Sequence, residues 1–152
     1  MVNYSSPTAV STQTDYLSDQ DGNQIMSKAT VTLTSAQVLA LFTTPITLIA
    51  APGAGKFIQI FDITAKMTYK SATYAGANAL EIRYTNAAGV KVSADIPTSF
   101  INSASSVNYV GTIAAGVIAA NVPVVAAVPT ANPTTGNSAI TLEIFYAIRN
   151  SA

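Results

Sequence analysis

Apolar and polar residues alternate with a period of two along most of the chain. The alternation is clearest near the C-terminus, where Ile140, Leu142 and Ile144 alternate with Thr141 and Glu143. Because successive side chains of a strand point to opposite faces, this pattern predicts strands with one buried face. The predicted strands cover residues 25–34, 46–51, 56–69, 79–85, 90–96 and 139–149, with one or two more within 113–128 and a weakly patterned stretch at 100–112.

One short segment has helical rather than strand spacing. The residues Thr34-Ser35-Ala36-Gln37 fit a capping box, in which a threonine and a glutamine side chain satisfy the first backbone N–H groups of a helix. Apolar residues follow at helical spacing up to Phe42, and Thr43-Thr44-Pro45 ends the pattern. We therefore expect a single helix of about two turns.

These elements predict an all-β protein. About eight short strands separated by turn residues, with one small helix, are typical of an antiparallel sandwich, and we expect a jelly-roll-like one. The sandwich domain is expected to cover residues 25–152. Residues 1–24 are polar and lack periodicity, so they are expected to form an extended N-terminal arm.

The arm can be interpreted in two ways. One is a disordered terminus, as its composition allows; the other is a segment that docks on a neighbouring subunit by adding a strand to a sheet or by lying in a groove. Docking needs apolar anchors together with backbone hydrogen bonds, because ordering each residue costs about 1–2 kcal/mol. The candidate anchors are Tyr4, Val10, Tyr16 and Leu17.

The arm also differs from the domain in charge. It carries Asp15, Asp19 and Asp21 without a basic residue, so its net charge is −3 while the remainder, with seven basic and four acidic residues, is +3. The spacing of Asp19, Asp21 and Asn23 faintly resembles the start of an EF-hand loop. Thr30 stands where that loop needs a glutamate, so we interpret the segment as an acidic turn and expect no metal.

Composition argues against an enzyme. The chain has no His, Cys or Trp, and 14 of its 152 residues are charged. Catalysis usually needs a group that titrates near neutral pH, an activated nucleophile or a metal. We therefore expect no catalytic residues and no cofactor. The basic residues are scattered singly, which disfavours nucleic-acid binding, and the most apolar stretch, 113–128, is too short and interrupted to span a membrane.

Two further patterns suggest chemistry but have simpler explanations. The residues Ala51-Pro52-Gly53-Ala54-Gly55-Lys56 resemble a phosphate-binding loop, yet Phe57 replaces the required hydroxyl residue and a strand follows, so we predict a tight turn. Paired carboxylates could hydrolyse a glycoside. The available carboxylates are Asp62, Glu81, Asp95 and Glu143. We expect Asp62, Glu81 and Glu143 instead to form cross-strand ion pairs on outward strand faces.

Seven tyrosines are candidates for contacts between molecules. A tyrosine ring with its polar tip can stack on a carbohydrate, and it also suits a partly wet contact between subunits. We favour the subunit contact. The candidate interface residues are Tyr69, Tyr74, Tyr84 and Tyr109.

Residues 29–59, ATVTLTSAQVLALFTTPITLIAAPGAGKFIQ, and residues 80–89, LEIRYTNAAG, resemble small virion proteins of tailed bacteriophages. The resemblance implies a jelly-roll-like subunit, typically trimeric, that decorates the head as a cement protein or belongs to a fibre or tail. We expect a capsid decoration (cement) protein that is made in the host cytoplasm and clamps neighbouring major capsid subunits on the virion surface. The alternatives are a tail, fibre or neck component, or a module that binds a glycan or receptor.

Overall fold

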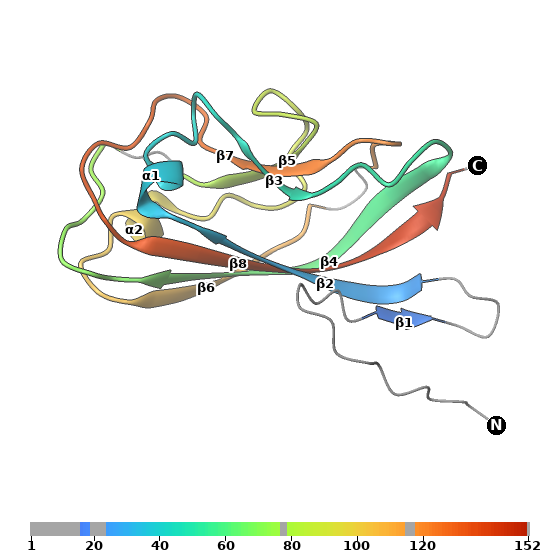
Figure 1. Ribbon diagram of the computed structural model, residues 1–152, viewed down its shortest axis with the longest axis horizontal. Helices are drawn as coiled ribbons and strands as arrows, with labels where there is room; N and C mark the ends of the chain where they lie inside the picture. Colours follow the sequence, from blue (N-terminus) through green and yellow to red (C-terminus); the bar gives the residue numbers. More distant parts are fainter. Residues whose placement is uncertain (1–15, 19–23, 77–78, 115–117, 152) are drawn as a thin grey trace.

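Two antiparallel sheets lie face to face and enclose the core (Figure 1). This computed structural model describes residues 16–18, 24–76, 79–114 and 118–151. The all-β antiparallel sandwich expected from the sequence is confirmed. The five-stranded sheet has the order β1 (Tyr16–Ser18), β2 (Gln24–Leu33), β8 (Ala139–Asn150), β4 (Lys56–Thr68) and β6 (Val107–Gly111), and the three-stranded sheet has the order β3 (Ile46–Ile49), β7 (Val124–Ala127) and β5 (Glu81–Tyr84).

The chain changes sheet at nearly every step. From β2 it crosses to β3, returns to β4 and crosses again to β5. It then returns to β6, crosses to β7 and ends in β8. As a result β8, the last strand, lies between β2 and β4 and pairs with both. The sandwich is therefore closed by contacts between residues far apart in the sequence.

The pairing of β4 with β8 is the longest in the molecule's described part. It runs from Lys56 opposite Asn150 to Thr68 opposite Ala139 and is interrupted by one bulge at Phe61. A bulge inserts one residue and shifts the alternation of side chains. The core-facing positions accordingly change from even to odd numbers: Ile58 and Ile60 face the core before the bulge, and Ile63, Ala65 and Met67 face it afterwards.

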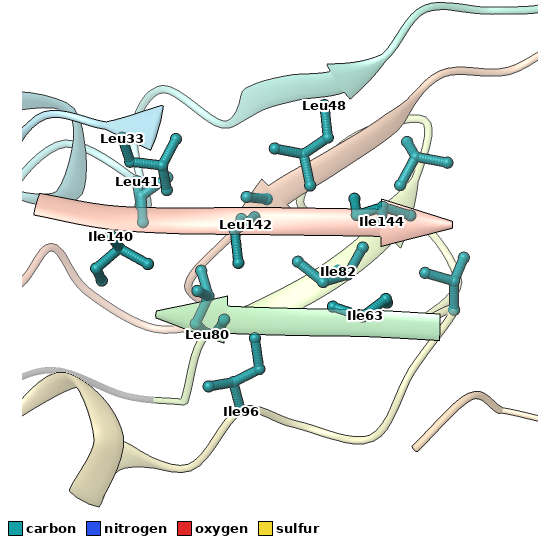
Figure 2. Close-up of a cluster of buried hydrophobic side chains, with 14 of the residues drawn as sticks. Leu33, Leu41, Leu48, Ile63, Leu80, Ile82, Ile96, Ile140, Leu142 and Ile144 are labelled. Atoms are coloured by element: carbon teal, nitrogen blue, oxygen red, sulfur yellow. The ribbon is translucent and has the colours of Figure 1, made fainter. Parts of the chain in front are cut away.

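The core fills the space between the two sheets (Figure 2). The expected inward residues of β8 are buried, and all four residues of β7 are buried as well. A branched aliphatic side chain contributes roughly 1.5–3 kcal/mol when it is fully buried. Residues without any exposed surface include Leu33, Leu41, Ile63, Leu80, Ile82, Ile96, Ile140, Leu142 and Ile144.

The predicted capping box is present at α1 (Ser35–Val38). The backbone N–H of Gln37 donates to Oγ1 of Thr34 at 3.3 Å, and the N–H of Thr34 donates to Oε1 of Gln37 at 2.9 Å. The helix is shorter than the expected two turns. Oδ1 of Asn132 accepts hydrogen bonds from the backbone N–H groups of Phe42 and Thr43. Because these N–H groups then need no partners within a helix, the chain can turn toward β3.

Two expectations for the middle of the chain need correction. A second short helix, α2 (Thr98–Ile101), follows Pro97 where no helix was expected. The strand expected over 90–96 forms only isolated bridges, such as Arg83 with Lys91 and Leu80 with Ile96, beside β5. Short weakly patterned segments give no clear period, so tertiary contacts decide their conformation.

Two loops, residues 71–75 and 134–137, are joined by several hydrogen bonds. Oδ1 of Asn137 accepts the N–H groups of Ser71 and Ala72 at 3.2 and 3.1 Å. Thr134 and Ala75 exchange backbone hydrogen bonds of 2.8 Å in both directions. Gly136, at a φ of +92°, lies so close to the Tyr74 ring that an added Cβ would be 2.3 Å from it.

We therefore predict that Gly136→Ala lowers the free energy of unfolding by about 2–4 kcal/mol, because it combines an overpacked contact with a strained backbone. Gly53→Ala is the matched control: its φ is +99°, but no atom lies within 4 Å of the added Cβ. The control should lose only about 1–2 kcal/mol from strain. Urea unfolding of both variants measures the difference, and equal losses would show that the Tyr74 contact is unimportant.

Candidate interaction surface

One face of the five-stranded sheet points away from the core, and we call it the outer face. The register places its side chains in rows that cross four strands, and most of them are threonine or charged. Both short helices lie on the opposite side of this sheet, toward the three-stranded sheet (Figure 1). The outer face consists of Lys28, Thr30, Thr32, Asp62, Thr64, Lys66, Asn108, Val110, Thr141, Glu143 and Phe145.

Neighbouring side chains on the outer face pair with one another. Nζ of Lys28 lies 2.8 Å from Oε1 of Glu143, across the β2–β8 boundary, and 5.7 Å from the ring centre of Phe145. The hydroxyl oxygens of Thr32 and Thr141 are 3.0 Å apart. Threonines on adjacent strands present methyl and hydroxyl groups side by side. A sheet face of this composition suits contact with another protein surface better than it suits a small ligand, which needs a concave site.

The exposed apolar side chains beside this face are spread out. Val110, on the edge strand β6, is 68% exposed, and Phe61, at the β4 bulge, is 41% exposed. Val110 is exposed because its register with Thr64 places it on the outer face. Met26, at the other side of the sheet, is 36% exposed. Single exposed apolar residues are common, so these three mark no patch by themselves.

The carboxylates have cationic or hydroxyl partners. The expected cross-strand ion pair of Glu143 is confirmed by its contact with Lys28. Glu81 was expected to face outward, but it is only 3% exposed. Oε2 of Glu81 contacts Nη2 of Arg83 at 2.5 Å, and Oε1 contacts Nζ of Lys91 at 2.6 Å. Two cations cover this carboxylate, and a buried charge is stable only when it is paired in this way.

Lys91 extends the network to a fourth residue. Its Nζ also lies 2.6 Å from Oδ1 of Asp95, which is more exposed. Hydrogen bonds from Lys91 to Asp95 and Glu81 raise the pKa of Lys91 above its ordinary value. The fourth carboxylate, Asp62, accepts a long hydrogen bond of 3.5 Å from Thr64. The spacing Glu81-x-Arg83 was a usable signal for this network, because residues two apart in a strand share a face.

Two of the candidate interface tyrosines lie inside the subunit. Tyr74 is 2% exposed and its hydroxyl donates to the backbone carbonyl of Ser138. Tyr84 is 3% exposed and its hydroxyl donates to the carbonyl of Ile58 at 2.7 Å. Burial raises the pKa of Tyr74 to about 12 and also raises that of Tyr84. Their rings fill the core and their hydroxyl groups bind backbone on other elements.

The other two tyrosines are half-buried near the β4–β6 side of the molecule. Tyr109 packs its ring edge-on against Phe100, with centres 6.3 Å apart, and its hydroxyl donates to the carbonyl of Asp95 at 3.2 Å. Tyr69 follows β4, and its backbone N–H donates to Oγ of Ser106 at 3.1 Å. Tyr69 and Tyr109 therefore stay candidates for contact with another molecule.

The structure describes two of the four candidate arm anchors. Tyr16 and Leu17 lie in β1, opposite Ser27 and Met26 of β2 in the same chain. This strand is added to the sheet of the same chain. Tyr4 and Val10 lie outside the described residues. The predicted acidic turn, with Asp15, Asp19 and Asp21, also lies outside them.

The segment that resembles a phosphate-binding loop is a turn. Gly53 and Gly55 have φ values of +99° and +71°, and β4 begins directly at Lys56. The N–H of Gly53 donates to Oδ1 of Asn121 at 3.0 Å. The predicted tight turn is thus confirmed, and its backbone N–H is used to hold a neighbouring loop.

Two kinds of feature are absent from the described residues. They contain no cluster of three or more Asp, Glu, His or Cys side chains that could share a metal ion. None of their helices is long and apolar enough to cross a bilayer.

Comparisons with known proteins give a distant structural likeness. No family model matches the chain, and no curated protein matches it either. A solved structure described as the cyanophage Pam1 capsid asymmetric unit contains a chain with a similar fold, at a TM-score of 0.46 and 13% sequence identity. The alignment covers 96% of this chain and 93% of that one.

We predict that Glu81→Gln destabilises the fold by about 2–4 kcal/mol, because it leaves Arg83 largely buried without its counter-charge. The matched control is Asp95→Asn, which removes an exposed partner of Lys91 and should cost less than about 1 kcal/mol. Urea unfolding at neutral pH measures both values. Similar losses in the two variants would contradict a structural role for the buried carboxylate.

Stability should fall at alkaline pH, in part because of Tyr74. Its pKa is about 12 in the folded protein against an ordinary value of 10.0, so between these pH values the unfolded chain loses its proton first. Loss of a proton from the unfolded state alone favours unfolding. We predict that in Tyr74→Phe the free energy of unfolding declines less steeply with pH in this range. The change in slope corresponds to up to about one proton fewer released on unfolding. Urea midpoints from neutral pH to pH 12 test this, and an unchanged slope would contradict it.

Proposed function

We propose that this protein is a structural component of a phage virion and acts as a capsid decoration (cement) protein. The observation that carries the proposal is the outer face of the five-stranded sheet, where most side chains are threonine or charged and on which neither described helix packs. A surface of this kind fits an extended contact with a large assembled partner. The proposed partner is the major capsid protein, and we infer a binding role rather than catalysis.

The segment that resembles phage virion proteins supports a structural role. Its residues 29–59 form the second half of β2, then α1, β3, the Gly-rich turn and the start of β4. Distinctive positions within it have structural tasks, among them the capping box at Thr34 and the left-handed glycines of the turn. The strand order β2-β8-β4-β6 against β3-β7-β5 supports the jelly-roll connectivity that the resemblance implies.

The mechanism we propose is thermodynamic. A protein that binds the assembled shell and not its separated subunits stabilises the shell by mass action, and the stabilisation grows with concentration above the dissociation constant. Many copies that each clamp neighbouring capsid subunits add their contributions. We further propose a trimer, with Tyr69 and Tyr109 as candidates for contact between its subunits.

The decisive experiment adds purified protein to phage heads that lack it and follows release of the genome on heating. We predict a higher release temperature with the unmodified protein. Thr64→Arg, in the middle of the outer face, should lose at least about tenfold in affinity for heads, because it places a long charged side chain in a flat contact. Thr47→Arg, an exposed threonine on β3 in the other sheet, should bind normally.

The outcomes separate the alternatives. If the unmodified protein leaves the release temperature unchanged, cementing is wrong. If both arginine variants bind as well as the unmodified protein, cementing can stand but the outer face is not the contact. Light scattering coupled to size exclusion gives the mass in solution and tests the trimer.

A further inference from the structure

Two charges of opposite sign lie on one strand of the outer face without a counter-charge. Asp62 and Lys66 both belong to β4 and stand two positions on either side of Thr64. Among the described residues, the Asp62 carboxylate has one partner, the Thr64 hydroxyl at 3.5 Å. The side chain of Lys66 is exposed and has no ion pair or hydrogen bond with any described residue. Four residues of strand span about 13 Å, which is too far for the two charges to pair with each other.

The other charges of the outer face are already paired. Nζ of Lys28 lies 2.8 Å from Oε1 of Glu143, so these two residues add no net charge to the face. The face therefore offers another molecule one unpaired acid and one unpaired base, at equal distances from Thr64 along β4.

An exposed apolar side chain lies in the same row as Thr64. Val110 of β6 is in register with Thr64, and 68% of its surface is exposed. Covering such a side chain with another apolar group is favourable because apolar surface leaves water. A contact centred on Thr64 would bury Val110 as well.

These positions have the symmetry of a twofold contact. A twofold axis that lies between two outer faces, along the row of Thr64 and Val110, reverses the order of residues along β4. Asp62 of each copy then lies opposite Lys66 of the other, and Val110 lies opposite Val110. Packed sheets commonly keep their strand directions within about 30° of each other, which this arrangement allows. The face is thus complementary to itself, as a twofold interface requires.

We propose that two copies of this protein associate face to face through their outer faces. Two reciprocal ion pairs between Asp62 and Lys66, and the contact of Val110 with Val110, hold the copies together. The occupant is a second copy because the face itself carries both members of each ion pair. Glu143, which lies in the row of the axis, does not oppose the contact because Lys28 neutralises it.

The dimer is expected to be weak. The outer face is smaller than the roughly 20–30 residues on each side of a stable complex. We expect a dissociation constant of about 0.1–1 mM. The proposal does not depend on the function proposed above. The dimer and a capsid shell would use the same face, so the two contacts exclude each other.

Exchange of the two charges tests the dimer in the full-length protein. Asp62→Lys places two pairs of lysines opposite each other, and Lys66→Asp places two pairs of carboxylates opposite each other. Each single variant should raise the dissociation constant at least about tenfold, because like charges replace both ion pairs. The double variant, Asp62→Lys with Lys66→Asp, restores both ion pairs with reversed polarity and should return to within about threefold of the unmodified protein. Sedimentation velocity from about 20 μM to about 1 mM measures these constants.

The design separates this contact from an effect of net charge. The two single variants change the net charge in opposite directions, yet both should weaken the dimer. Lys70→Asp is the matched control, since Lys70 is an exposed lysine that follows the end of β4. It makes the same change in charge as Lys66→Asp and should leave the dissociation constant unchanged.

Three outcomes would overturn the proposal. Sedimentation that does not change with concentration up to about 1 mM would show that the unmodified protein forms no such dimer. Association that persists in both single variants would place the contact on another surface. A double variant that stays as weak as the single variants would show that Asp62 and Lys66 do not face each other across the contact.

Discussion

The long antiparallel pairing of β4 with β8 is the constraint on which the rest of the structure depends. It joins the middle of the chain to its C-terminal end, and each of the two strands carries a further neighbour, β6 on β4 and β2 on β8. The bulge at Phe61 keeps both halves of β4 facing the core. If β4 instead continued past Ile60 as a regular strand that included Phe61, then Ile63, Ala65 and Met67 would turn to solvent, because the side-chain period of a strand is two residues.

Much of this architecture could be predicted from the sequence because the relevant signals are local. The alternation in β2 and β8, the capping box at Thr34 and the turn at Gly53 each depend on a few adjacent residues, and each was found where expected. The bulge is visible only as a break in alternation. The sequence shows that Phe57 to Phe61 is apolar at nearly every position, but not which residue is the extra one.

The surface could be predicted less well, because burial depends on which strands become neighbours. Glu81 has an outward position in its own strand, yet Arg83 and Lys91 cover it. Tyr74 and Tyr84 belong to a residue type that is common at interfaces, yet loop packing and the contact between the two sheets place them in the core. Val110 is apolar but lies on the edge strand, where its register with Thr64 turns it outward. No local pattern marks the burial of the two tyrosines or the exposure of Val110.

Several charged side chains in the described part of the chain are engaged with one another. Glu81, Arg83 and Lys91 form one network with Asp95, and Lys28 pairs with Glu143. The hydroxyl groups of the two most buried tyrosines donate to backbone carbonyls on other elements. The outer face keeps several threonines and charged side chains exposed. Sheet faces and strand edges recognise other proteins by shape and by strand pairing, which agrees with the proposed role in assembly.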